Sequence, residues 1–140
     1  MIITNKKIKM EVTMGSKKEL TLNEYQEKAM TTCLPTSYNW SYMFLNLVGE
    51  VGEFASKVAK HIRKEKAYID VNQLMTECGC SYMSNEEIKD LQKEVGDVLW
   101  QLSGLCSVMG WSLEDIAQQN LDKLASRQQR NVIEGSGDNR

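Results

Sequence analysis

The sequence predicts an all-α protein whose helices form an antiparallel four-helix bundle. Two observations predict this class. Apolar residues recur at helical spacing through most of the chain after residue 20, whereas the alternation typical of strands occurs only before it. The chain also contains a single proline, Pro35, so little interrupts helices beyond that point. A length of 140 residues suits one domain.

The first two helices are expected on either side of Pro35. The first begins after Thr21, because Thr21 and Glu24 have the spacing of a capping box, in which hydroxyl and carboxylate accept hydrogen bonds from early backbone N–H groups. Pro35 lies at or just beyond its end, since proline disfavours a helical conformation in the residue before it. The second helix is predicted over residues 40–64, where one side is apolar and the other is polar and charged.

The third and fourth helices are expected in the second half of the chain. The third covers residues 85–109, with Ser84 and Glu87 as a second capping box and Gly110 as its C-terminal stop. Ser112 caps a fourth helix that reaches about residue 129. Together the four helices form a domain over residues 21–130.

Three segments fall outside these helices. Residues 1–20 are expected to form a short N-terminal arm, either a strand or hairpin or a disordered segment, because Ile8, Met10 and Val12 alternate with charged residues. Residues 66–83 form the longest connection, in which 69–75 is expected to make a short helix or a lid. Residues 131–140 are expected to be a flexible tail.

The composition excludes several classes of protein. The formal net charge is −2, so no global basic field attracts nucleic acid. No apolar run approaches the roughly 18 residues of a membrane span, and the N-terminus lacks the apolar stretch of a secretory signal peptide. We therefore expect a cytoplasmic protein with no nucleic-acid or membrane partner. Its four cysteines would stay reduced there, and Cys78-Gly79-Cys80 is too tight for the usual zinc pair.

A short phrase with two acids occurs twice, as Glu50-Val51-Gly52-Glu53 and as Glu94-Val95-Gly96-Asp97. The acids of each phrase are three residues apart, so they share one face of a helix. Two such helices side by side bring four carboxylates together, and four like charges repel unless a cation neutralises them. An all-oxygen cluster suits a hard cation such as Mg²⁺, which usually binds a few carboxylates together with substrate phosphates. The phrases therefore indicate phosphate chemistry.

The ordinary interpretation of a charged stripe is a solvated helix face, and two observations favour a site instead. Acids at i and i+3 repel each other, whereas exposed faces favour Glu with Lys at i+4. Gly52 and Gly96 each cost about 1 kcal/mol relative to Ala within a helix, and they face away from the acids, where they would let another helix approach closely. A di-iron bundle is disfavoured, because it needs Glu-x-x-His pairs and no glutamate precedes His61 by three residues.

At these phrases the sequence resembles the MazG-like nucleotide pyrophosphohydrolases of the all-α NTP pyrophosphatase superfamily. Their mark is a Glu-x-x-Glu pair followed by Glu-x-x-Asp. The context matches as well, because residues 47–53 read Leu-Val-Gly-Glu-Val-Gly-Glu and residues 91–100 read Leu-Gln-Lys-Glu-Val-Gly-Asp-Val-Leu-Trp. Residues 120–130 are similar to the last helix of the family, and the resemblance covers roughly residues 21–130.

This resemblance implies cleavage of a nucleoside triphosphate between its α and β phosphates, which yields a monophosphate and pyrophosphate. It implies Mg²⁺ as the cofactor, with Mn²⁺ as a substitute, held by Glu50, Glu53, Glu94 and Asp97. Bound ions would polarise the phosphates and lower the pKa of a water that attacks the α-phosphorus. Of the four acids, Glu53 is the expected general base.

Further contacts are expected from the same resemblance. The candidate phosphate contacts are Lys60, Lys123, Arg127 and Arg130. The candidate contacts to base or sugar are Asn120, Trp40, Tyr42 and Trp100. Relatives pair their subunits with sites near the interfaces, so a homodimer or homotetramer is expected. The chain departs from the usual family spacing, with about 40 residues between Glu53 and Glu94, and the extra part is interpreted as a lid or a partner surface.

Two other functions remain open at this stage. The same site would also fit another phosphorylated nucleotide, such as an alarmone or a nucleotide conjugate. A helical regulatory or interaction module without turnover is the non-enzyme alternative. The intact set of four acids argues against that module, because an interaction protein has no need to gather them.

Overall fold

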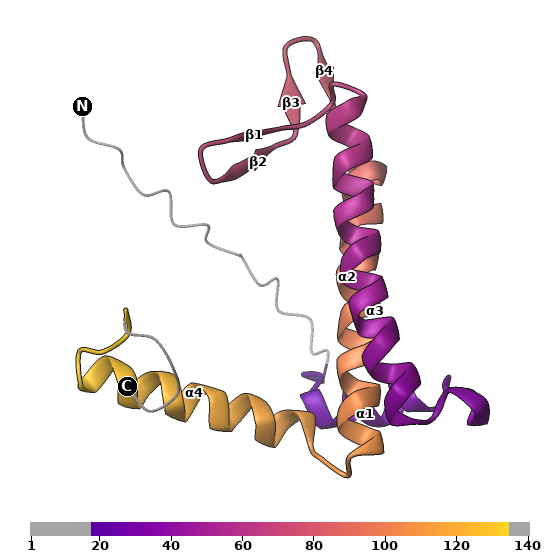
Figure 1. The fold of residues 1–140 in the computed structure, drawn as a ribbon, viewed down its shortest axis with the longest axis vertical. Coiled ribbons are helices and arrows are strands. Elements are labelled where there is room, and N and C mark those ends of the chain that lie inside the picture. Colours follow the sequence, from indigo (N-terminus) through magenta and orange to yellow (C-terminus); the bar gives the residue numbers. More distant parts are fainter. Residues whose placement is uncertain (1–17, 135–140) are drawn as a thin grey trace.

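The protein was analysed as a computed structural model, which describes residues 18–134 apart from the side chain of Cys78. The helices are α1 (Leu22–Met30), the short 3₁₀ helix η1 (Pro35–Ser37), α2 (Trp40–Arg63), α3 (Asn85–Val108) and α4 (Leu113–Gln129) (Figure 1). The strands are β1 (Tyr68–Asp70), β2 (Gln73–Met75), β3 (Glu77–Cys78) and β4 (Ser81–Tyr82). The expected helices are therefore present, and a small amount of antiparallel sheet accompanies them.

The helix boundaries follow the capping residues that the sequence predicts. The Thr21 hydroxyl accepts a hydrogen bond from the N–H of Glu24, whose carboxylate accepts one from the N–H of Thr21. Ser84 and Glu87 form the same reciprocal box at the start of α3. Each box satisfies backbone donors that have no partner within the helix, so the start of the helix is defined locally.

Helices α2 and α3 form a long antiparallel hairpin. Each has 24 residues, which corresponds to about 36 Å of helix. Near the β strands, the hairpin encloses a core of Ala67, Met83 and Leu91, with Phe54 and Val58 packed against it. At the opposite end, the side chain of Met43 is fully buried. Buried apolar contacts at both ends of the hairpin therefore hold α2 and α3 side by side.

The connection between α2 and α3 is a β arm, defined as residues 67–83, that extends sideways from the tip of the hairpin (Figure 1). It consists of two antiparallel hairpins, in which Tyr68 pairs with Met75 and Glu77 pairs with Tyr82. The expected short helix over residues 69–75 is therefore wrong. Val71 turns the first hairpin at φ 55° and Gly79 turns the second at φ 61°, and such left-handed residues cannot continue a helix.

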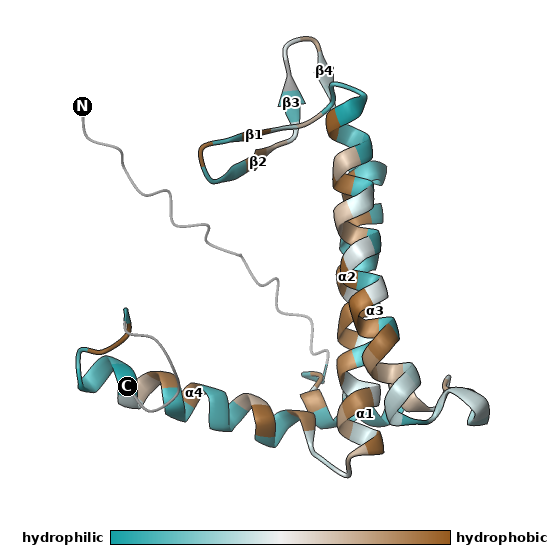
Figure 2. Cartoon of the chain, viewed as in Figure 1, coloured by the Kyte–Doolittle hydropathy of each residue, from teal (hydrophilic) through white to brown (hydrophobic). Residues whose placement is uncertain are grey.

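The predicted four-helix bundle does not form within one chain. Helix α1 packs beside α3, where Nε1 of Trp100 donates a hydrogen bond to the carbonyl oxygen of Ala29 at 3.1 Å. Helix α4 instead leads away from the α2–α3 pair (Figure 1), and its Leu121 and Leu124 are 60% and 42% exposed. Figure 2 shows that α4 is largely hydrophilic, with a few apolar stretches. The reason is the turn at Gly110, whose φ of 71° redirects the chain after α3.

The predicted close approach behind the two mid-helix glycines is also missing from the single chain. A Cβ at Gly52 or Gly96 would meet no atom of another described element within 4 Å. The expected N-terminal arm and C-terminal tail lie largely outside the described residues. Within residues 18–134, no helix is long and apolar enough to cross a membrane.

Candidate functional site

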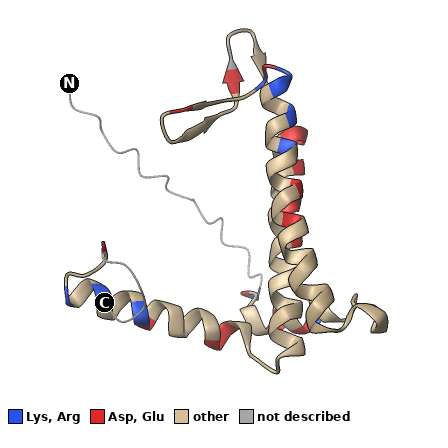
Figure 3. Ribbon diagram, in the orientation of Figure 1, with Lys and Arg blue, Asp and Glu red and all other residues tan. Residues whose placement is uncertain are grey.

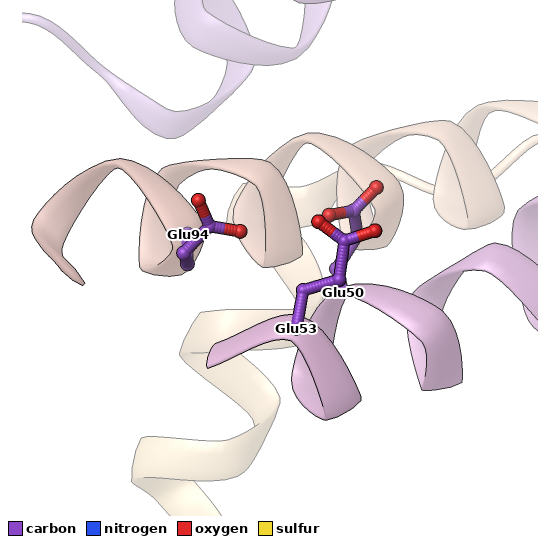
Figure 4. Close-up of side chains that lie close together, drawn as sticks. All are labelled: Glu50, Glu53 and Glu94. Atoms are coloured by element: carbon purple, nitrogen blue, oxygen red, sulfur yellow. The ribbon is translucent and has the colours of Figure 1, made fainter. Parts of the chain in front are cut away.

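Three of the predicted acids meet between α2 and α3. Glu50 and Glu53 come from one face of α2 and Glu94 comes from α3 (Figure 4). One carboxylate oxygen from each lies within 4.8 Å of the others. We call these residues the acid trio. The spacing of three along α2 and the antiparallel pairing with α3 together bring the carboxylates to one place, as the sequence predicts.

Glu94 is the most buried member of the acid trio, at 6% exposed. Its Oε1 lies 2.6 Å from Nζ of Lys57, which forms an ion pair with it. Its Oε2 is buried, and no described residue donates a hydrogen bond to it. A buried carboxylate oxygen without a donor is costly, so this oxygen is a place where a bound cation would stabilise the protein.

Glu50 shows the electrostatic cost of the arrangement. The pKa of its carboxyl is raised first by burial and then by repulsion from Glu53, Asp97 and Glu94. Asn46 acts against this shift, because its Nδ2 donates a hydrogen bond to Oε1 of Glu50 at 3.1 Å. The site therefore contains more negative charge than its own donors compensate.

Asp97 lies outside the acid trio but within electrostatic reach of it, since its charge contributes to the raised pKa of Glu50. It also contributes, after burial, to the raised pKa of Tyr25. Tyr25 is thus a neighbour of the site that was not among the candidates predicted from the sequence. No signal in the sequence reveals this proximity, because it arises from the packing of α1 against α3.

Basic residues lie on the part of α2 and α3 nearest the β arm, next to the acidic stretch (Figure 3). Lys57 forms ion pairs with Glu94 and with Asp90, whose Oδ2 lies 3.1 Å from Nζ of Lys57. The ammonium donates a hydrogen bond to each carboxylate, and these bonds raise its pKa. Lys60, a predicted phosphate contact, lines a small pocket together with Lys57, His61 and Lys64. The structure therefore places Lys60 close to the acids, and it shows that Lys57, which the sequence analysis left unassigned, is a charge partner of Glu94.

The predicted contacts from the fourth helix are not brought to the acid trio within one chain. Asn120, Lys123, Arg127 and Arg130 lie on α4 or at its end. Figures 1 and 3 show this helix leading away from the acidic stretch of α2 and α3. Arg127 is buried, and Asn120 and Lys123 line a shallow pocket with Ile116 and Gln119 on α4 itself.

The predicted base contacts are divided between two places. Trp40 stacks on Phe44 at the start of α2, with ring centroids 4.9 Å apart, and Tyr42 is exposed nearby. Nε1 of Trp100 donates hydrogen bonds to the carbonyl oxygen of Ala29 and to the Thr32 hydroxyl, and these bonds stabilise the packing of α1 against α3. Trp100 therefore has a structural contact that the sequence did not predict.

Comparison with known proteins agrees with this geometry. Residues 40–132 match the model of the MazG nucleotide pyrophosphohydrolase domain, a region that includes both acid pairs. The chain therefore belongs to this family, which confirms the resemblance found in the sequence. It is also similar to the Gene 37 protein of Mycobacterium phage L5, with 41% identity over 100 residues that cover 71% of this chain and 75% of the relative. No solved structure shows a significant match.

Proposed function

We propose that the protein is a Mg²⁺-dependent nucleoside triphosphate pyrophosphatase that converts an NTP or dNTP to the monophosphate and pyrophosphate. The observation that supports this most strongly is the acid trio with the buried, donorless Oε2 of Glu94. Repulsion among clustered carboxylates favours the binding of a cation. Membership of a family of nucleotide pyrophosphohydrolases supports the class of reaction.

The residues fit a hard divalent cation, because every donor is a carboxylate oxygen. Glu50, Glu53, Glu94 and Asp97 would hold Mg²⁺, or Mn²⁺ in its place. The bound ion would supply Lewis-acid polarisation of the phosphates and a more acidic water. Glu53 is the exposed member of the acid trio, so it can reach a water on the solvent side and orient it as the general base for attack on the α-phosphorus.

The remaining contacts surround the phosphates and the nucleoside. Lys60 lies on the same face of α2 as Glu53, nearer the β arm, where it would neutralise phosphate charge. Lys123, Arg127 and Arg130 are proposed as further phosphate contacts, and Asn120, Trp40, Tyr42 and Trp100 as contacts to base or sugar. Because α4 leads away from the acids of its own chain, we propose that its residues serve the site of a second copy.

A homo-oligomer, dimeric or tetrameric, is supported by the apolar surface of the single chain. Val48, Val51 and Val95 on α2 and α3 are each more than half exposed, as is Leu121 on α4. The open space at Gly52 and Gly96 would accept a closely packed helix. Exposed apolar patches of this kind mark protein interfaces, and we propose no nucleic-acid or membrane partner.

The test is the release of pyrophosphate from each common ribo- and deoxyribonucleoside triphosphate, with Mg²⁺ and with EDTA. We expect Mg²⁺-dependent pyrophosphate together with an equal amount of monophosphate. Orthophosphate as the product would mean that a different bond is cleaved. If no triphosphate is hydrolysed, the same assay with alarmones and nucleotide conjugates separates another nucleotide substrate from a module without turnover.

A further inference from the structure

Lys57 lies between the acid trio and the basic pocket near the β arm. Its Nζ is 2.6 Å from Oε1 of Glu94 and 3.1 Å from Oδ2 of Asp90. It follows Glu53 by four residues on α2, so it shares the helix face of that acid, one turn nearer the β arm. A single ammonium group thus touches one of the proposed metal ligands directly.

The Lys57–Glu94 pair differs from the other lysine–carboxylate pairs of the described residues in its burial. The side chain of Glu94 is 8% exposed, whereas the carboxylate partners in the other pairs, apart from those of Lys57, are at least 26% exposed. Water and salt screen exposed pairs strongly and buried groups much less. Lys57 therefore acts on the charge of the acid trio more directly than the lysines on the outer surface.

We propose that Lys57 is a resident counter-cation of the acid trio, which holds Glu94 in place and competes with a divalent cation for it. This inference rests on the proposed metal site. A dication bound to Glu94 would lie within a few ångströms of the ammonium, where like charges repel strongly in a partly buried site. Metal binding must therefore either displace Lys57 from Glu94 or overcome this repulsion, and both reduce the affinity for the free ion.

The pocket beside Lys57 indicates what receives the displaced ammonium. Lys60 and Lys64 line this pocket with Lys57, and neither forms an ion pair with another described residue. The two acids of the pocket already have lysine partners, because Lys66 pairs with Glu87 and Lys93 pairs with Asp90. The pocket thus has more lysines than its two acids neutralise, and a phosphate group would supply the missing negative charge. When a metal–polyphosphate complex binds, the metal would replace Lys57 as the partner of Glu94, and a phosphate would replace Glu94 as the partner of Lys57.

The test uses Lys57→Met, which keeps the length of the side chain and removes its charge. Free Mn²⁺ should bind the variant about tenfold more tightly than the wild type, a difference of about 1.4 kcal/mol, as measured by electron paramagnetic resonance of unbound Mn²⁺. The Mn²⁺–pyrophosphate complex should bind it more weakly, as measured by calorimetry, because the ammonium no longer meets a phosphate. Opposite changes in the two affinities are the signature of the proposed role.

Lys93→Met is the matched control, because Lys93 also pairs with Asp90 but is 71% exposed and has no ion pair with Glu94. It removes the same charge nearby, and we expect it to change either affinity by less than about twofold. The Lys57→Met change is also made in a Glu94→Gln background, in which residue 94 no longer carries the negative charge that pairs with Lys57. There it should alter Mn²⁺ affinity no more than Lys93→Met does.

Several results would overturn the inference. Unchanged or weaker binding of free Mn²⁺ by Lys57→Met would exclude competition, and an equal gain in Lys93→Met would mean that only net charge matters. Parallel changes in both affinities would indicate a structural role. A wild type that binds Mn²⁺ no better than Glu94→Gln does would instead refute the proposed metal site itself, which separates the two failures.

Discussion

The thioether of Met43 lies in the space that a side chain at residue 104 would occupy. Met43 is on α2 and is fully buried, and Gly104 is a buried position on α3. The absence of a side chain at Gly104 therefore lets the two helices approach at the end of the hairpin opposite the β arm. This contact helps to set the register of α2 and α3, on which the meeting of the acid trio depends.

Gly104→Ala should destabilise the protein by about 1–3 kcal/mol, because the added methyl overpacks the buried Met43. Gly96→Ala on the same helix is the control, since its Cβ would meet no other described element. At a protein concentration low enough to dissociate the proposed oligomer, that change should stabilise the protein by up to about 1 kcal/mol through helix propensity. Urea unfolding measures both, and equal effects would show that Met43 moves aside freely.

Glu53→Ala and Asp97→Ala should abolish turnover while leaving the helix content nearly intact, because both residues are proposed metal ligands on helix faces rather than core residues. Pyrophosphate release and far-ultraviolet circular dichroism provide the two measurements. Glu65→Ala, at a charged position just beyond α2, is the control for the loss of one carboxylate. Loss of folding in both site variants would mean that these acids are structural.

Asn46→Ala should reduce metal affinity or activity by about tenfold or more, because groups that orient a metal ligand typically contribute this much. The Nδ2 of Asn46 donates to Oε1 of Glu50 and so holds that carboxylate in one orientation. Mn²⁺ titration and steady-state kinetics measure the effect. Asn46→Gln offers the same amide one methylene farther out, and a variant of either kind with wild-type affinity would argue against this orienting role.

Glu50→Gln should stabilise the metal-free protein near neutral pH. The raised pKa of Glu50 means that its ionised form costs stability in the folded state. The contribution of the Glu50 carboxyl to the free energy of unfolding is fully present below its pKa in the unfolded chain, about 4.5. That contribution is lost as the pH rises through the raised pKa of the folded state. The gain in unfolding temperature, measured in EDTA, should therefore disappear in acid below that value. Mn²⁺ should reverse the order by stabilising the wild type more than the variant.

Leu121→Glu combined with Leu124→Glu should lower the molar mass in light scattering from that of an oligomer toward that of the monomer, 16.0 kDa. Both leucines are exposed on α4 in the single chain, and charges there would oppose burial against a second copy. Ser126→Glu adds charge on a different side of the same helix and should leave the mass unchanged. A wild type that is already monomeric would contradict the proposed assembly.

The helices and most of the acid cluster follow from local features of the sequence. The Thr21 and Ser84 capping boxes and the positive φ of Gly110 are determined by residues within one turn of each boundary, so these predicted boundaries agree with the structure to within about a residue. The predicted end of the first helix does not agree, because α1 ends at Met30, five residues before Pro35. The meeting of Glu50, Glu53 and Glu94 follows from the period of the helix and an antiparallel neighbour. The capping boxes and the helix period are short-range effects that the sequence contains completely, whereas the pairing of α2 with α3 joins residues far apart in the chain.

Other features depend on residues far apart in the chain, and only the tertiary structure decided them. The approach of Tyr25 to Asp97 and the hydrogen bond from Trp100 to Ala29 require α1 to pack on α3. The burial of Glu94, its pairing with Lys57 and the direction of α4 depend on how helices pack in three dimensions. Helix periodicity specifies which side chains share a face, whereas packing specifies what that face meets. The sequence by itself therefore determined the helices and the acids, and the tertiary structure decided their charge partners and left α4 outside the bundle.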